Sequence, residues 1–137
     1  MSEKKKILLF VDDDPTYIAA QSAFFSSRGF AVLTADGSDA ALKVLENETP
    51  DMILIDLMME HFDSGFTLAR RIRQEERFQS TPLVMLSGVA SETGTGFAQE
   101  REALKKWSHL DDFLDKPVSV HRLLSIIERR LGNSEER

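Results

Sequence analysis

The sequence places acidic, hydroxyl and basic side chains at the ends of short apolar runs. Asp12–Asp14 follow the first run, and Asp56 follows another. Ser87 and Lys116 come at the ends of two later runs. Each has an ordinary explanation by itself, because Asp and Ser are common turn residues and Lys is usually exposed. Their shared position at the ends of apolar runs favours a common site.

These residue types together suit phosphoryl chemistry. Neighbouring carboxylates repel one another unless a cation neutralises them. Oxygen ligands without His or Cys favour a hard cation, and Mg²⁺ fits best because it accepts one or two carboxylates and keeps waters or phosphate oxygens. The metal and the Lys116 ammonium would offset charge on the transferring oxygens. An Asp carboxylate could then act as the nucleophile and form an aspartyl phosphate.

Apolar runs alternate with helical patterns along the chain, which predicts five βα units. Near-continuous apolar strands of this kind are typical of a parallel sheet with helices on both faces. The carboxyl ends of parallel strands lie at the same edge, where such folds bind their ligands. The predicted strands cover residues 7–11, 30–34, 51–55, 83–86 and 112–114, and the helices cover about 15–28, a segment capped by Ser38, 65–76, 97–107 and 119–131.

Five segments together resemble the receiver domain of two-component response regulators. The resemblance implies an α/β fold of the flavodoxin-like (βα)5 type, a doubly wound five-stranded parallel sheet of order 2-1-3-4-5. It implies a receiver domain over residues 1–131 and a polar tail over 132–137. The segments are Ile7–Pro15, Ala35–Leu42, Ile55–Met59, Met85–Gly88 and Phe113–Pro117.

The resemblance assigns a phosphoacceptor and a metal site. Asp56 would accept the phosphoryl group. The ion would be Mg²⁺, or Mn²⁺ in its place. Its ligands would be Asp12, Asp13, Asp56 and the backbone carbonyl of Met58.

The resemblance also assigns a switch. Ser87 would donate a hydrogen bond to the phosphoryl group, and Lys116 would pair with it. Phe113, three residues before Lys116, would move inward when Ser87 moves. Phosphorylation would thereby change the face that contacts other proteins.

Partners follow from the same resemblance. A histidine kinase or a histidine phosphotransfer protein would donate the phosphoryl group, and the phosphorylated protein could form a homodimer. The protein would be a signalling switch in a phosphorelay rather than an enzyme. The sequence does not define its downstream protein target.

Composition excludes several other classes. The formal net charge is −6 over 137 residues, which disfavours direct nucleic-acid binding. There is no cysteine, so a thiolate metal site is excluded. No apolar run approaches the length of a membrane span, and a cytoplasmic protein is expected.

Two other functions fit parts of the sequence. Residues 9–16 also resemble the Asp-x-Asp-x-Thr motif of haloacid-dehalogenase phosphatases, with Asp12 as nucleophile, but this leaves the loop after Asp56 and the Lys116-Pro117 pair without a role. A pseudo-receiver that binds partners without phosphorylation is the third possibility. The site of acyl-phosphate formation separates all three.

The sequence departs from the family pattern in two regions. Glu60 and Ser64 stand where the family usually has Pro and Gly. Glu60 could retune recognition of the phosphodonor or could simply be solvated. The stretch from Ser87 to Lys116 is also several residues longer than usual.

Overall fold

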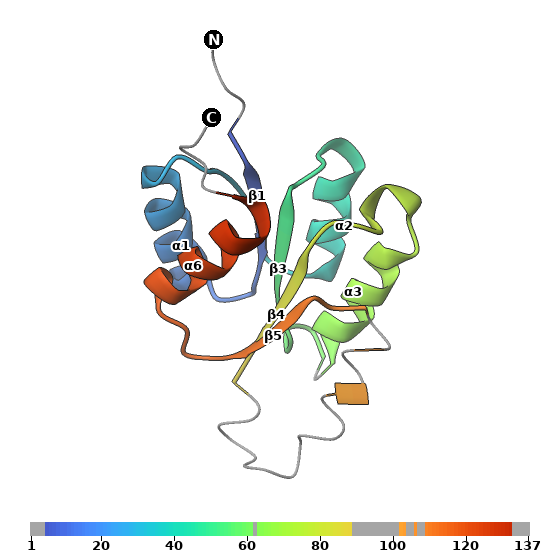
Figure 1. The fold of residues 1–137 in the computed structure, drawn as a ribbon. Helices are drawn as coiled ribbons and strands as arrows, with labels where there is room; N and C mark the ends of the chain where they lie inside the picture. The colour runs from blue at the N-terminus through green and yellow to red at the C-terminus, as the bar shows by residue number, and fades with distance from the viewer. Residues whose placement is uncertain (1–4, 62, 89–101, 104–105, 107–108, 133–137) are drawn as a thin grey trace.

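The structure is a computed structural model that describes residues 5–61, 63–88, 102–103, 106 and 109–132. Five parallel strands form one sheet in the order β2-β1-β3-β4-β5 (Figure 1). This confirms the predicted α/β fold and its strand order. The strands are β1 (Ile7–Val11), β2 (Ala31–Ala35), β3 (Met52–Asp56), β4 (Leu83–Ser87) and β5 (Asp112–Asp115), and the helices are α1 (Pro15–Ser27), α2 (Ser38–Asn47), α3 (Ser64–Arg73), the 3-10 helix η1 (Glu76–Phe78) and α6 (Val120–Leu131).

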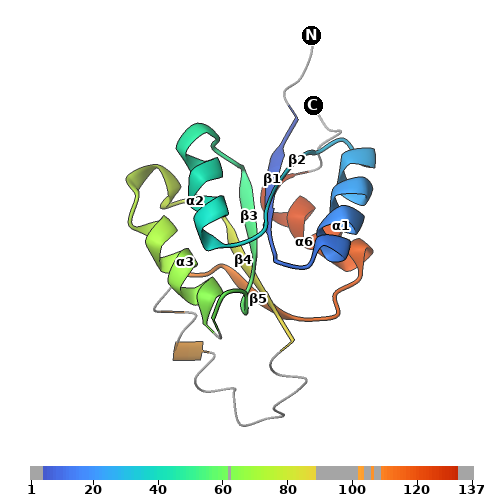
Figure 2. The same cartoon turned by 180° about the vertical axis from the view of Figure 1, so that it is seen from behind.

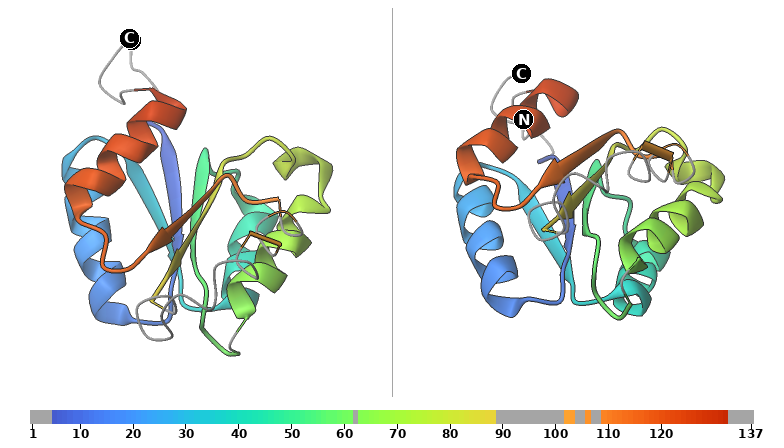
Figure 3. Two further views of the ribbon diagram at one scale, coloured as in Figure 1. Left: turned by 60° about the horizontal axis from the view of Figure 1, so that its bottom comes forward. Right: turned by 90° about the horizontal axis from the view of Figure 1, so that it is seen from below.

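Helices cover both faces of the sheet. Helices α1 and α6 lie on one face and α2 and α3 on the other (Figures 2 and 3). Successive residues of a strand point to opposite faces. Leu9 and Ile53 therefore pack on the α2–α3 side, and Phe10 and Leu54 on the α1–α6 side. Two apolar layers, one on each face, hold the strand ends in register.

Local capping sets where α1 and α6 begin. Asp14 is the N-cap of α1 and its side chain accepts hydrogen bonds from Thr16 N and Tyr17 N, with Pro15 in the first turn. Ser119 caps α6 in the same way.

Several predicted boundaries differ from the structure, most of them by one residue, and three of these differences bear on the site or its supports. Asp56 is the last residue of β3 rather than the residue after it. The predicted helix 65–76 ends at Arg73, because the Arg73 guanidinium donates to Phe78 O and Thr81 O and turns the chain into η1. Ser38 is the first residue of α2 and not its cap, a position taken by Gly37.

Most of the predicted helix 97–107 lies outside the described residues, although residues 102, 103 and 106 are helical. Within the described part of the chain, no helix has both the length and the apolar character needed to cross a bilayer.

Candidate functional site

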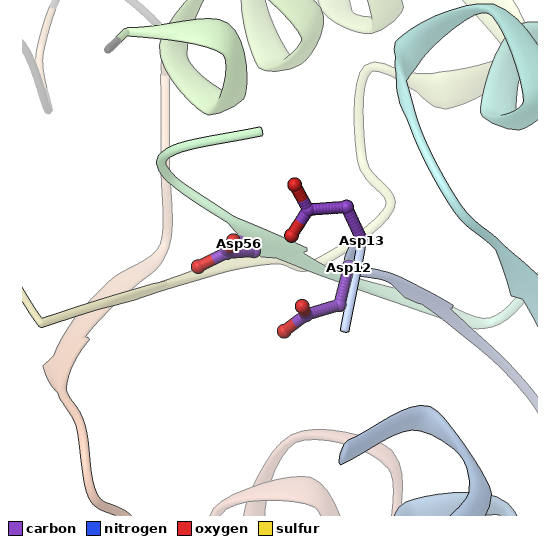
Figure 4. A group of neighbouring side chains, drawn as sticks. All are labelled: Asp12, Asp13 and Asp56. Carbon is purple, nitrogen blue, oxygen red and sulfur yellow. The ribbon is translucent and has the colours of Figure 1, made fainter. Parts of the chain in front are cut away.

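Three carboxylates meet at the carboxyl edge of the sheet. Asp12 and Asp13 directly follow β1, and Asp56 ends the neighbouring strand β3. Each offers an oxygen, and these oxygens lie within 4.8 Å of one another. Figure 4 shows the three side chains projecting to the same side of the strand ends. The donor set consists of oxygens alone, which fits a hard divalent cation.

Asp12 is held rigidly within this group. Its residue is only 3% exposed. Its Oδ1 accepts a hydrogen bond from Asp14 N at 2.9 Å, and its Oδ2 accepts one from Lys116 Nζ at 2.8 Å. A buried carboxylate needs such partners to remain charged. Both oxygens of Asp12 are therefore already engaged by the protein.

Lys116 bridges two strands from the far end of the chain. Its Nζ lies 2.8 Å from Asp12 Oδ2 and 3.2 Å from Asp56 Oδ1. Its backbone N donates to Ser87 O at 2.7 Å, which fixes the end of β5 against the end of β4. Burial lowers the pKa of Lys116, but the hydrogen bond and the charge of Asp12, together with Asp56, outweigh burial and raise it. Lys116 is thus a fixed cation in the acidic cluster.

Tyr17 belongs to the site although the sequence analysis did not identify it. It lies in the first turns of α1, and Lys116 Nζ sits 4.5 Å from the centre of its ring. A cation in this position is attracted by the ring face. Burial raises the pKa of Tyr17 to about 12, with Lys116 opposing and Asp12 adding to that shift. The only available signal was an aromatic residue soon after Asp12 and Asp13 in the first turns of a helix.

Burial and the neighbouring carboxylates disfavour charge on Asp56. Burial is the main cause, Lys116 opposes it, and Asp12 and Asp13 add to it, so that the pKa of Asp56 is raised to about 6. A divalent cation among these carboxylates would favour their charged forms. The site therefore attracts a cation most strongly when all three are ionised.

This raised pKa predicts a pH-dependent effect on stability. Asp56→Asn should raise the free energy of unfolding of the metal-free protein at neutral pH by about 1–2 kcal/mol. This figure is smaller than the pKa shift alone implies, because water screens the charge of the partly exposed carboxylate. The charged carboxylate destabilises the native state as pH rises from the ordinary value of 3.8 through about 6. The gain should therefore disappear towards pH 4. Urea unfolding in a chelator at both pH values measures it, and an equal gain at both would contradict the prediction.

The structure places the remaining predicted residues around this group. Ser87 ends β4 and is buried. Phe113 lies in β5 among the buried side chains of the α2–α3 side, with its ring 5.7 Å from that of Phe66. The Met58 side chain is exposed, and Met58 lies in the loop that follows Asp56. Their assigned roles remain predictions.

The loop after Asp56 is closed by a tight backbone contact at Gly65. Gly65 N donates to Leu57 O at 2.7 Å. A Cβ at Gly65 would lie 2.6 Å from Asp56 O and 2.7 Å from Leu57 Cα. Only glycine allows the backbone segments to approach this closely.

We expect Gly65→Ala to lower the free energy of unfolding by about 2–3 kcal/mol, because backbone atoms would have to move. Gly88→Ala is the matched control, since a Cβ there meets nothing within 4 Å. Urea unfolding followed by circular dichroism compares the two. Equal stability of both variants would show that the loop accommodates the methyl group.

Comparison with known proteins relates the chain to signalling proteins. A family model described as the response regulator receiver domain matches residues 8–128. Sensor histidine kinase GacS of Pseudomonas protegens is 30% identical over 133 residues, which are 96% of this chain and 14% of that protein. The DNA-binding dual master transcriptional regulator RpaA of Synechocystis is 30% identical over 130 residues, 93% of this chain and 50% of that protein.

Among solved structures, the chemotaxis response regulator CheY4 of Vibrio cholerae superposes with a TM-score of 0.80 and 26% identity, over 93% of this chain and 100% of that one. This chain therefore corresponds to half or less of the two curated relatives and to the whole of the CheY4 chain.

Proposed function

The chain belongs to the family of response regulator receiver domains, and from this premise we propose that it is a switch that carries a phosphoryl group on Asp56. Receiver domains are signalling switches of two-component systems rather than classical enzymes. The observation that carries the proposal is the cluster of Asp12, Asp13 and Asp56 with Lys116 bridging Asp12 and Asp56. We take residues 1–131 as the receiver domain and 132–137 as a polar tail.

Asp56 is a better-placed nucleophile than Asp12. Its side chain is 12% exposed, whereas that of Asp12 is 3% exposed with both oxygens accepting hydrogen bonds. An Asp56 oxygen would attack the phosphorus while the bond between phosphorus and the donor's histidine nitrogen breaks. Lys116 would offset the charge on the phosphoryl oxygens, and the Ser87 hydroxyl would donate a hydrogen bond to one of them.

The carboxylate cluster fits the magnesium that this family typically binds. Asp12, Asp13, Asp56 and the carbonyl of Met58 would hold Mg²⁺, or Mn²⁺ in its place. The bound ion would offset negative charge on the phosphoryl oxygens and on the attacking carboxylate. Asp14 N and Lys116 hold the Asp12 carboxylate in place. The fixed carboxylate would in turn help to orient the ion.

Signal output would follow from repacking near β5. Ser87 and Phe113 lie on adjacent strands, with Met85 opposite Phe113 and Ser87 opposite Asp115. Movement of Ser87 towards a phosphoryl group would allow Phe113 to shift and alter the face beside β5 and α6. A histidine kinase or histidine phosphotransfer protein is the proposed donor in the cytoplasm, and a homodimer is a proposed product of phosphorylation. A protein target suits the net charge of −6 better than nucleic acid does.

Peptide mapping tests the proposal directly. The protein is incubated with Mg²⁺ and a small phosphodonor, and mass spectrometry then locates the acyl phosphate. We expect it on the peptide that contains Asp56 and only in the presence of the metal. A phosphoryl group on the peptide that contains Asp12, with multiple turnover, would instead support the phosphatase. No acyl phosphate at all would support the pseudo-receiver.

A further inference from the structure

Glu60 makes a contact that neither of its sequence-based explanations anticipated. It lies in the loop between β3 and α3, whose described residues 57–61 and 63 we call the acceptor loop. One oxygen of its carboxylate, Oε2, accepts a hydrogen bond from Ser38 N at 2.7 Å. The other, Oε1, accepts one from Ser38 Oγ at 3.0 Å. The acceptor loop is thereby attached to the first residue of α2.

This contact supplies the cap that α2 lacks. The N-cap residue Gly37 has no side chain, and no side-chain capping bond is made there. The first N–H groups of a helix need acceptors, and a carboxylate suits the partial positive charge at a helix N-terminus. A Cβ at Gly37 would collide with Glu60 Oε2. Gly37, Ser38 and Glu60 therefore form a complementary set drawn from two separate segments.

The acceptor loop is also attached at its base. Leu57 N donates to Leu86 O, and Gly65 N donates to Leu57 O. Ser64 Oγ accepts a hydrogen bond from His61 N at 2.7 Å. Met58 therefore lies between two attached residues of the loop, Leu57, which is bonded to β4, and Glu60, which is bonded to α2. The two residues that depart from the family pattern, Glu60 and Ser64, both hold this loop.

We propose that Glu60 is a positioning residue for the Mg²⁺ site. By binding the N-terminus of α2, it holds the acceptor loop so that the backbone carbonyl of Met58 faces the metal position beside Asp56. This inference rests on the proposed function and adds a role for α2 in it. Residues that orient a metal ligand typically contribute 10-fold or more to affinity.

Three variants and a control separate positioning from charge. Glu60→Ala removes both acceptors and the negative charge. Ser38→Pro removes both donors but leaves the Glu60 charge in place. Proline suits the first position of a helix, and the extended backbone of Gly37 suits the residue before proline. The third variant combines the two changes. Glu46→Ala is the charge control, because Glu46 is an exposed acid of α2.

The Mg²⁺ Kd of folded protein is measured by titrating MgCl₂ and following backbone amide signals by NMR. We expect Glu60→Ala and Ser38→Pro each to weaken binding by about 5- to 10-fold, at or below the lower end of the range for residues that orient ligands. The double variant should be no weaker than either single variant, because both changes break one contact. Glu46→Ala should match the wild type.

The initial rate of Asp56 phosphorylation at subsaturating Mg²⁺ should fall in parallel with the affinity and recover at saturating Mg²⁺. A purely structural cap would lower metal-free stability while leaving the Mg²⁺ Kd of the folded protein unchanged, and that result would overturn the inference. Weaker binding in Glu60→Ala but not in Ser38→Pro would assign the effect to charge and would also overturn it. Either outcome leaves phosphorylation of Asp56 intact in the wild type. Wild-type protein that bound no Mg²⁺ would overturn both the inference and the proposed metal site.

Discussion

Asp56→Asn should accumulate acyl phosphate at least about 1,000-fold more slowly than the wild type with the same phosphodonor and Mg²⁺, because nothing replaces the attacking oxygen. Asn is close in size to Asp but lacks a nucleophilic carboxylate. The neighbouring Asp12 is a poor substitute, since both of its oxygens accept hydrogen bonds from the protein. Intact-mass spectrometry over a time course measures the loss.

Asp63→Asn is the matched control for this experiment. Asp63 is the last residue of the acceptor loop, is exposed, and makes no side-chain capping hydrogen bond at the start of α3. It removes the same charge without touching the carboxylate cluster, so acyl-phosphate formation should stay close to the wild-type rate. Retention of the phosphoryl group by Asp56→Asn on the peptide that contains Asp12 would refute Asp56 as the phosphoacceptor.

Arg73→Ala should lower the free energy of unfolding by about 3 kcal/mol, because it leaves three partly buried acceptors without their donor. The Arg73 side chain is only 9% exposed. Its guanidinium donates to the carbonyls of Phe78, Thr81 and His109 and to the Asp111 carboxylate, at 2.6–2.9 Å. It thereby joins the end of α3 to the segments that begin β4 and β5.

Arg71→Ala provides the comparison on the same helix. The Arg71 side chain is 55% exposed and lies 3.7 Å from Glu75. An exposed ion pair of this kind contributes little, so the loss should stay below about 0.5 kcal/mol. Urea unfolding gives both values, with a lower midpoint and an unchanged slope expected for Arg73→Ala. Similar losses for the two variants would show that the Arg73 contacts do not stabilise the fold.

The position of the carboxylates was predictable from a parallel sheet together with the strand order that the family resemblance implies. Apolar runs alternating with helical patterns indicate a parallel sheet, and all carboxyl ends of such a sheet lie together. Asp12 and Asp13 follow β1 and Asp56 ends the neighbouring strand β3, so all three lie close together at this edge, and the structure places one oxygen of each within 4.8 Å of the others. The cap at Asp14 was predictable because a cap contacts residues only two or three positions away.

The contacts that hold the site were not predictable in this way. Lys116 reaches Asp12 across 104 positions of sequence, and Glu60 reaches Ser38 across 22. Tyr17 contacts Lys116 only because the fold brings the first turns of α1 beside the residue that follows β5. In the sequence Arg73 looks like an ordinary basic residue of a helix, and only the structure shows that it donates to the carbonyls of Phe78 and Thr81.

The sequence by itself determined the α/β class with its parallel sheet and the three carboxylates at strand ends, because periodicity and residue type act within one element. The strand order followed from the resemblance to receiver domains. Tertiary structure decided which distant side chains fix those carboxylates. Lys116, Tyr17 and Glu60 each contact a segment whose position depends on how helices and loops pack across the sheet. That packing is a property of the whole core, and no pattern within a single element encodes it.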